Sequence, residues 1–151
     1  MCRSSGPMHA MDVRYFMGDR VKDKVVIVTG AGSVGSGIGN GKAAAVLYAR
    51  EGARVMLVDY NLEAAEETKR LIDEENGDSF VSQADVSTSD DCARIVNECI
   101  GNYGRIDILH NNVGIEIPGG IEEISEDDWD RKESPSSSSI SLFVSSAASR
   151  L

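Results

Sequence analysis

Six glycines lie between residues 30 and 41, after an apolar run and before an alanine-rich segment. Beside a phosphate, glycines make a tight turn, let the main chain approach the anion, and let a helix pack closely on a strand. A helix that begins there also points unpaired N–H groups at the anion. The pattern therefore predicts a dinucleotide-binding turn.

A carboxylate stands at the distance that such a turn requires. Asp59 follows Gly41 by 18 residues, and a carboxylate about 20 residues on accepts hydrogen bonds from the adenosine ribose hydroxyls. A plain turn-forming role at the end of a strand is the alternative for Asp59. Asp59 would also repel the 2′-phosphate of NADP, and Tyr60 and Asn61 add no positive charge. We therefore expect NAD, with NADP the less favoured cofactor.

The segments that must position these residues alternate between two periodicities. Short apolar or alternating runs predict strands at Val25–Thr29, at Arg54–Asp59, within 80–86 and at 106–110. Amphipathic segments predict helices at 41–51, at 62–75 and from 121 to 130. A further helix is predicted before Gly104, with Ser87 and Ser89 as candidate N-caps and Asp90-Asp91 in its first turn. Strands that alternate with helices predict an α/β fold, a Rossmann-type doubly wound parallel sheet, truncated after about four strands.

Three regions differ in composition. Residues 1–20 contain no apolar signal region and are expected to form a disordered extension. Residues 21–131 are expected to form a dinucleotide-binding half-domain. Residues 132–151 contain nine serines and no helical period, so we expect a disordered serine-rich tail.

The bulk composition excludes several classes of function. The formal net charge of −10 argues against a nucleic-acid partner and against anionic lipid. No apolar run approaches the roughly 18 residues of a membrane span. His9 and His110 lack the spacing of metal ligands, so no metal is expected. Three sparse cysteines indicate free thiols in a reducing compartment, which favours a cytoplasmic localisation; Cys92 and Cys99 share a helix face and are expected to pack there.

Several motifs occur in one order along residues 21–131. Thr29-Gly30 opens a TGxxxGxG-like motif, Asp85-Val86 closes the stretch 80–86 that contains the third predicted strand, and Asn111-Asn112-Val113-Gly114 is close to NNAG. In these motifs the chain resembles the short-chain dehydrogenase/reductase family. The resemblance implies an oxidoreductase of secondary alcohols or ketones. It also implies cofactor contacts at Gly30, Ser33, Gly39, Gly41, Asp59, Asp85, Val86, Asn111 and Gly114, of which Asp85-Val86 resembles the dipeptide that contacts adenine in that family.

The glycine motif departs from the family pattern in its length. Thr29 to Gly41 spans twelve residues, where the motif spans seven. Counting back from Asp59 makes Gly39-Asn40-Gly41 the helix-side pair, whereas the letters GIG favour Gly37-Ile38-Gly39. Helix length favours the first alignment. The extra residues either extend the phosphate cradle through Ser33 or form a surface insertion without a role.

The second departure concerns catalysis. The family uses a Tyr-x-x-x-Lys pair, in which the lysine lowers the pKa of the tyrosine that transfers the proton. The residues four positions after Tyr15, Tyr48, Tyr60 and Tyr103 are Asp19, Gly52, Ala64 and Asp107. We therefore assign no catalytic residue and expect a truncated chain with little or no activity. A non-catalytic NAD-binding or interaction module, paired with a full-length relative through an exposed sheet edge, is the alternative.

Overall fold

The computed structural model describes residues 20–33, 35 and 37–114. Strands and helices alternate through this part of the chain: β1 (Val25–Thr29), α1 (Asn40–Arg50), β2 (Arg54–Asp59), α2 (Leu62–Glu74), β3 (Asp78–Gln83), α3 (Ser89–Tyr103) and β4 (Ile108–Asn111). The predicted α/β fold with a parallel sheet is confirmed. The helix expected at 121–130, the extension at 1–20 up to residue 19 and the tail at 132–151 lie outside the described residues.

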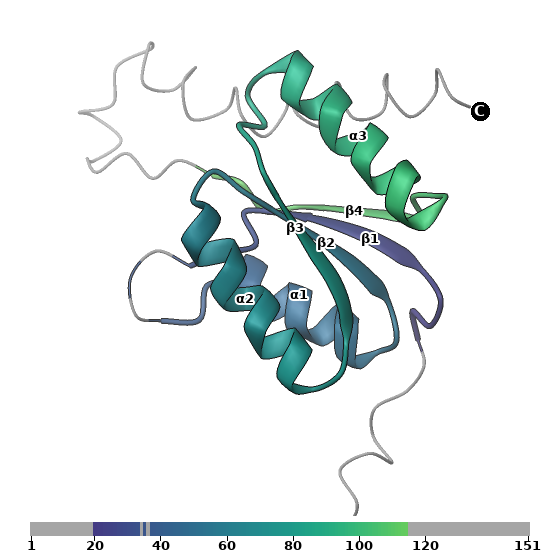
Figure 1. Ribbon diagram of the computed structural model, residues 1–151. Coiled ribbons are helices and arrows are strands. Elements are labelled where there is room, and N and C mark those ends of the chain that lie inside the picture. The colour runs from purple at the N-terminus through teal and green to yellow at the C-terminus, as the bar shows by residue number, and fades with distance from the viewer. Residues whose placement is uncertain (1–19, 34, 36, 115–151) are drawn as a thin grey trace, which may run out of the picture.

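The four strands form one parallel sheet in the order β3-β2-β1-β4. Helices α1 and α2 cover one face and α3 covers the other (Figure 1). The chain runs from β1 outward to β3 and then returns to the other side of β1 for β4. The point of reversal lies between β1 and β4, and in open α/β sheets a crevice for ligands forms at such a point.

The two central strands are apolar over residues 25–28 and 55–58 because both of their faces are covered. Val25, Ile27, Met56 and Val58 pack on one side with Cys92, Ile95, Val96 and Cys99 of α3. Val26, Val28, Val55 and Leu57 pack on the other side with Ala45 of α1 and Ile72 of α2. These two clusters hold the carboxyl ends of the strands in fixed positions.

The third strand begins earlier and ends earlier than the alternation within 80–86 predicts. It spans Asp78–Gln83 because its six residues pair one to one with the six residues of β2. Asp85 and Val86 consequently lie in the connection to α3 rather than in the strand.

The cap of the third helix also differs from the expectation. Thr88 is the N-cap, with its hydroxyl accepting a hydrogen bond from the Asp91 N–H at 3.3 Å, and Ser89 is the first helical residue. Ser87 lies outside the helix and donates to the Asp85 carboxylate. At the other end Gly104 terminates the helix with a φ of 79°.

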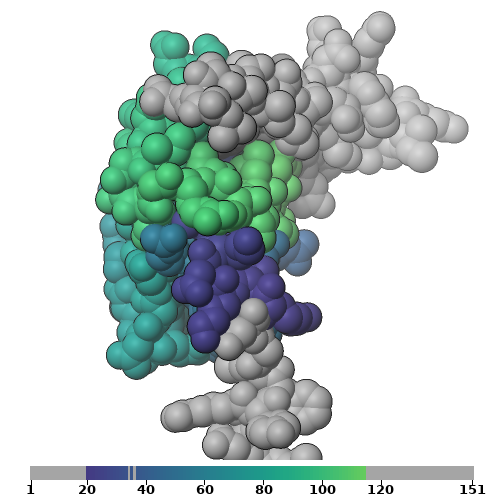
Figure 2. All heavy atoms as spheres, turned by 90° about the vertical axis from the view of Figure 1, so that its right-hand side faces the viewer, coloured from purple at the N-terminus to yellow at the C-terminus, as the bar shows by residue number. Residues whose placement is uncertain are grey.

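The segment before β4 is joined to the start of β1. Asp107 Oδ2 accepts a hydrogen bond from the Val25 N–H at 2.9 Å, and the Asp107 N–H donates to the Val25 carbonyl at the same distance. The start of β1 and the segment between α3 and β4 lie side by side on the face shown in Figure 2. This contact sets where β4 enters the sheet.

Candidate cofactor-binding site

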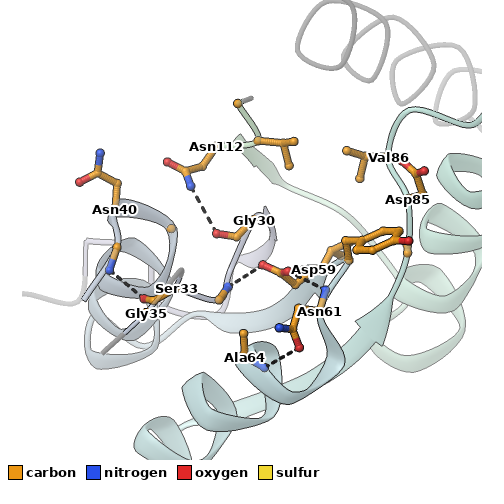
Figure 3. A pocket seen from close by; sticks show the side chains of 18 residues that line it. Gly30, Ser33, Gly35, Asn40, Asp59, Asn61, Ala64, Asp85, Val86 and Asn112 are labelled. Carbon is orange, nitrogen blue, oxygen red and sulfur yellow. Dashed lines mark hydrogen bonds between the residues drawn. The ribbon is translucent and has the colours of Figure 1, made fainter. Parts of the chain in front are cut away.

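A cavity of about 600 Å³ lies at the carboxyl ends of the four strands (Figure 3). Every strand contributes to it through the residues that end or follow the strand. The lining residues are Gly30, Gly32, Ser33, Gly35, Gly39, Asn40, Gly41, Val58, Asp59, Tyr60, Asn61, Ala64, Ala84, Asp85, Val86, Asn112, Val113 and Gly114. Eight of the nine residues expected to contact a cofactor lie in this lining, and Asn111 does not.

The glycine turn brings the start of α1 directly onto the end of β1. Gly30 has a φ of +64°, which a side chain would strain. A Cβ added to Gly41 would stand 1.9 Å from the Gly30 carbonyl oxygen and 2.7 Å from the Asn112 Nδ2. Only glycine fits at position 41, so the first turn of α1 lies in contact with the strand end.

The helix start distinguishes the two alignments of the glycine motif. Helix α1 begins at Asn40, with Gly39 as its N-cap. A Cβ added to Gly37 would meet nothing within 4 Å. The pair with a packing role at the helix start is therefore Gly39 and Gly41, and Gly37 lies before the helix.

Ser33 joins the two ends of the enlarged loop. Its Oγ accepts a hydrogen bond from the Gly39 N–H at 2.8 Å (Figure 3). The hydroxyl thereby satisfies one of the N–H groups at the start of α1, and a serine hydroxyl that accepts one hydrogen bond can still donate its own proton, here to a ligand in the cavity. The extra residues of the loop lie between Ser33 and Gly39, which this hydrogen bond joins.

Asp59 connects the glycine turn to the start of α2. Its Oδ2 accepts a hydrogen bond from the Gly32 N–H at 2.8 Å, and its Oδ1 accepts one from the Asn61 N–H at 2.9 Å. Asn61 in turn caps α2 by accepting from the Ala64 N–H at 3.3 Å. Asp59 therefore makes the contacts of a turn-forming residue at the end of a strand, and its carboxylate also lines the cavity.

Two consecutive asparagines take different places. The Thr29 hydroxyl donates to Asn111 Oδ1 at 2.8 Å, so Asn111 ties β4 to β1. Asn112 donates from its main chain to Thr29 Oγ1 at 3.2 Å and from its side chain to the Gly30 carbonyl at 3.3 Å. Within the four-residue motif, Asn112 and Val113 line the cavity although neither was among the expected cofactor contacts.

The signal for Asn112 was present in the strand alternation. Ile108 packs on the face covered by α1 and α2, whereas Leu109 and Val113 pack on the face covered by α3. Continuing a period of two places Asn112 on the α1 side, where the glycine turn lies. Asn111 falls on the opposite side.

The two sides of the cavity differ in their electrostatic character. The first turn of α1 contains no acidic residue, so the positive end of its dipole faces the cavity without a competing side chain. The carboxylates of Asp59 and Asp85 lie in the lining away from α1 (Figure 3). This arrangement suits a ligand with an anionic middle and hydroxyl or amino donors at one end.

The tyrosines of the described part are engaged elsewhere or lack a lysine partner. The Tyr48 hydroxyl lies 3.3 Å from His110 Nδ1, and the Tyr103 hydroxyl donates to Asp78 at 3.0 Å. Tyr60 lines the cavity, but Ala64 stands four residues on. Among residues 20–33, 35 and 37–114 no cluster of side chains could hold a metal ion, and none of their helices is long and apolar enough to cross a membrane.

Comparisons with known proteins agree with this geometry. The family model for short chain dehydrogenase matches residues 24–148. The chain is 44% identical over 108 residues to an uncharacterized oxidoreductase from Thermotoga maritima, covering 72% of this chain and 40% of the relative. It is 38% identical over 112 residues to meso-2,3-butanediol dehydrogenase from Serratia marcescens, covering 74% and 42%.

A solved structure extends the similarity to three dimensions. The crystal structure of hydroxysteroid dehydrogenase from Escherichia coli superposes with a TM-score of 0.74 at 28% identity, covering 87% of this chain and 54% of that one. The chain therefore spans about two fifths of the length of these two curated relatives and about half of that structure. The matched residues include the whole glycine turn, the sheet and the cavity lining. The chain belongs to the short-chain dehydrogenase family.

Proposed function

We propose that this chain binds NAD at the carboxyl ends of its strands, as the cofactor-binding portion of an oxidoreductase. The observation that carries the proposal is the close contact of Gly41 with Gly30, which brings the amino end of α1 to the cavity beside Asp59. The residues present fit a pyrophosphate at α1 and a ribose at Asp59. When bound, the nicotinamide of such a cofactor accepts or gives a hydride.

The described lining supports NAD rather than NADP. It contains no lysine or arginine among the described residues that could neutralise a 2′-phosphate. Asp59 stands at the end of β2 and would repel that phosphate. The binding residues of this proposal are Gly30, Ser33, Gly39, Gly41, Asp59, Asp85, Val86 and Gly114, with Asn112 in the lining and Asn111 behind it.

The proposed substrate is a secondary alcohol or the corresponding ketone. One relative is a dehydrogenase of a secondary diol, meso-2,3-butanediol. The 151 residues contain no Tyr-x-x-x-Lys pair, so we propose that they bind the cofactor with little or no turnover. The same observation favours the second candidate, a non-catalytic NAD-binding module that pairs with a full-length relative.

Two further features support the proposed partners and compartment. The described strands are ordered β3-β2-β1-β4, and an edge strand of a sheet can pair with a strand of another chain, which supports association through a sheet edge. Cys92 and Cys99 are free and buried, which supports a reducing, cytoplasmic compartment.

Calorimetric titration of the whole chain with NAD and with NADP tests the proposal. We expect NAD to bind more tightly, and Asp59→Ala to weaken NAD by about tenfold to a hundredfold, the range of a lost charge-assisted hydrogen bond. Asp73→Ala is the matched control, since Asp73 pairs with Lys69 on the exposed part of α2.

Two results would each overturn one part of the proposal. A folded wild-type chain that binds neither dinucleotide at millimolar concentration would remove the proposed function. Oxidation of NADH with a panel of ketones would leave the binding proposal intact, but it would overturn the expectation of little or no turnover.

A further inference from the structure

The first turn of α3 holds the main chain of the two lining residues that follow β3. The Asp85 N–H donates to Asp91 Oδ2 at 2.8 Å, and the Asp85 carbonyl accepts from the Thr88 N–H at 3.1 Å. The thiol of the buried Cys92 donates to the Val86 carbonyl at 3.4 Å. Three residues of the helix start thus fix the position of Asp85 and Val86 at the cavity.

Asp91 is itself oriented by an arginine one turn later. Arg94 Nε and Nη2 both donate to Asp91 Oδ1, at 3.2 Å and 2.8 Å. The same guanidinium donates to the Gln83 carbonyl and to Glu98, each at 2.8 Å. The two carboxylate oxygens of Asp91 are therefore divided, one for Arg94 and one for the Asp85 main chain.

The ion pair is too exposed to serve mainly folding stability. The side chains of Arg94 and Asp91 are 41% and 31% exposed, and ion pairs as exposed as this one contribute little to folding stability. The hydrogen bond to Asp85 lowers the pKa of Asp91, and Arg94 lowers it further, so the carboxylate stays charged and keeps both contacts at neutral pH. The main effect of the network is on position rather than stability.

We propose that Asp91 and Arg94 are positioning residues that set the Asp85 carboxylate against the adenine base, an inference that rests on the proposed function. Asp85 Oδ1 accepts hydrogen bonds from Ser87, at 3.0 Å from its N–H and 2.6 Å from its hydroxyl. With the main chain fixed as well, the carboxylate is held in one orientation in the lining. It can accept a hydrogen bond from the exocyclic amine of adenine, whereas the carbonyl of hypoxanthine at that place would be repelled.

Substituting Asp91 with asparagine is a sharp perturbation. One oxygen of Asp91 faces the Asp85 N–H and the other faces the Arg94 guanidinium, and both of these groups are donors. The amide of asparagine must turn its NH₂ group toward one of them, which sets donor against donor at unchanged volume. Arg94→Met removes the orienting charge, and Glu98→Gln is the control that removes the neighbouring charge while leaving Asp91 in place.

The assay is the affinity ratio between NAD and nicotinamide hypoxanthine dinucleotide for each folded variant of the whole chain. We expect the wild type to prefer NAD by at least about tenfold. We expect Asp91→Asn and Arg94→Met to reduce that ratio to about threefold or less, and Glu98→Gln to retain it. A purely structural loss would weaken both ligands equally and leave the ratio unchanged.

Each outcome decides between the claims. Wild-type protein that binds neither dinucleotide refutes the proposed function. Wild-type protein that binds both equally, or variants that keep the wild-type ratio, refute the positioning role while the proposed function stands. If circular dichroism shows that neither Asp91→Asn nor Arg94→Met folds, the network serves folding and the inference is wrong.

Discussion

Gly41→Ala tests whether the contact between α1 and β1 is as close as the structure requires. The added Cβ would stand 1.9 Å from the Gly30 carbonyl oxygen, whereas ordinary contact begins near 3.4 Å. The helix end would have to retreat by about 1.5 Å, the difference between these two distances. The clashing atom belongs to the main chain, so no side-chain rotation relieves it.

The expected cost follows from that displacement. Overpacking a well-packed site costs typically about 1–3 kcal/mol, and a clash with rigid backbone belongs at the upper end or beyond. We therefore expect a loss of about 3 kcal/mol from a total stability of about 5–15 kcal/mol. Dinucleotide affinity should fall as well, because the N–H groups at the start of α1 move away from the cavity.

The assay is equilibrium unfolding in urea followed by circular dichroism, with Gly37→Ala as the matched control. A Cβ at position 37 meets nothing within 4 Å, so that variant should stay within about 0.5 kcal/mol of the wild type. A Gly41→Ala protein as stable as the Gly37→Ala protein would refute the close packing of helix on strand.

Four other substitutions or conditions test separate parts of the fold. Gly101→Ala should stabilise the protein by about 0.5–1 kcal/mol in urea, because this α3 glycine has open space around its Cα and alanine favours the helix; no gain would contradict the helical assignment. Thr68→Val should cost about 1–3 kcal/mol in the same assay, since the buried hydroxyl donates to the Ala31 carbonyl at 2.8 Å, and a neutral result would speak against that bond. Burial raises the pKa of Cys99 to about 12 and also raises the pKa of Cys92. In a Cys2→Ser variant, the two buried thiols should therefore react with a thiol reagent at mildly alkaline pH only after the protein unfolds. Reaction of the native protein would contradict their burial. The pKa of Asp91 is lowered in the folded state, first by the hydrogen bond from the Asp85 N–H and then by Arg94. The folding stability that this carboxylate contributes is therefore present above its unfolded pKa of about 4 and should be lost as the pH falls below that value. The free energy of unfolding should fall more over this pH range in the wild type than in Asp91→Asn.

Elements whose sequence carries a strong local signal were predictable. The apolar runs at 25–28 in β1 and 55–58 in β2 are typical of strands covered on both faces. The glycine at position 104 and the charged face of α2 likewise mark their helices. The cavity lining followed from the same logic, since loops at the carboxyl ends of parallel strands must converge.

What escaped prediction depends on tertiary pairing. The bounds of β3 are set by its register with β2 rather than by its own alternation. Thr88 could not be chosen over Ser87 and Ser89 from residue type alone, because all three hydroxyl side chains are good caps. The contact from Asp91 to Asp85 spans a turn whose geometry no spacing rule reveals.

The hydrogen bond between Ser33 and Gly39 has a consequence for how this family can vary. The bond joins the two ends of the loop that contains the extra residues. The number of residues in this loop can therefore change without moving the flanking glycines. Insertions into a loop whose ends are joined in this way cost little folding free energy, since the entropy of loop closure grows only slowly with loop length. The number of residues between the glycines of the motif can therefore vary while Gly30 and Gly41 stay in contact. A peptide inserted into this loop should for the same reason leave the contact between α1 and β1 intact.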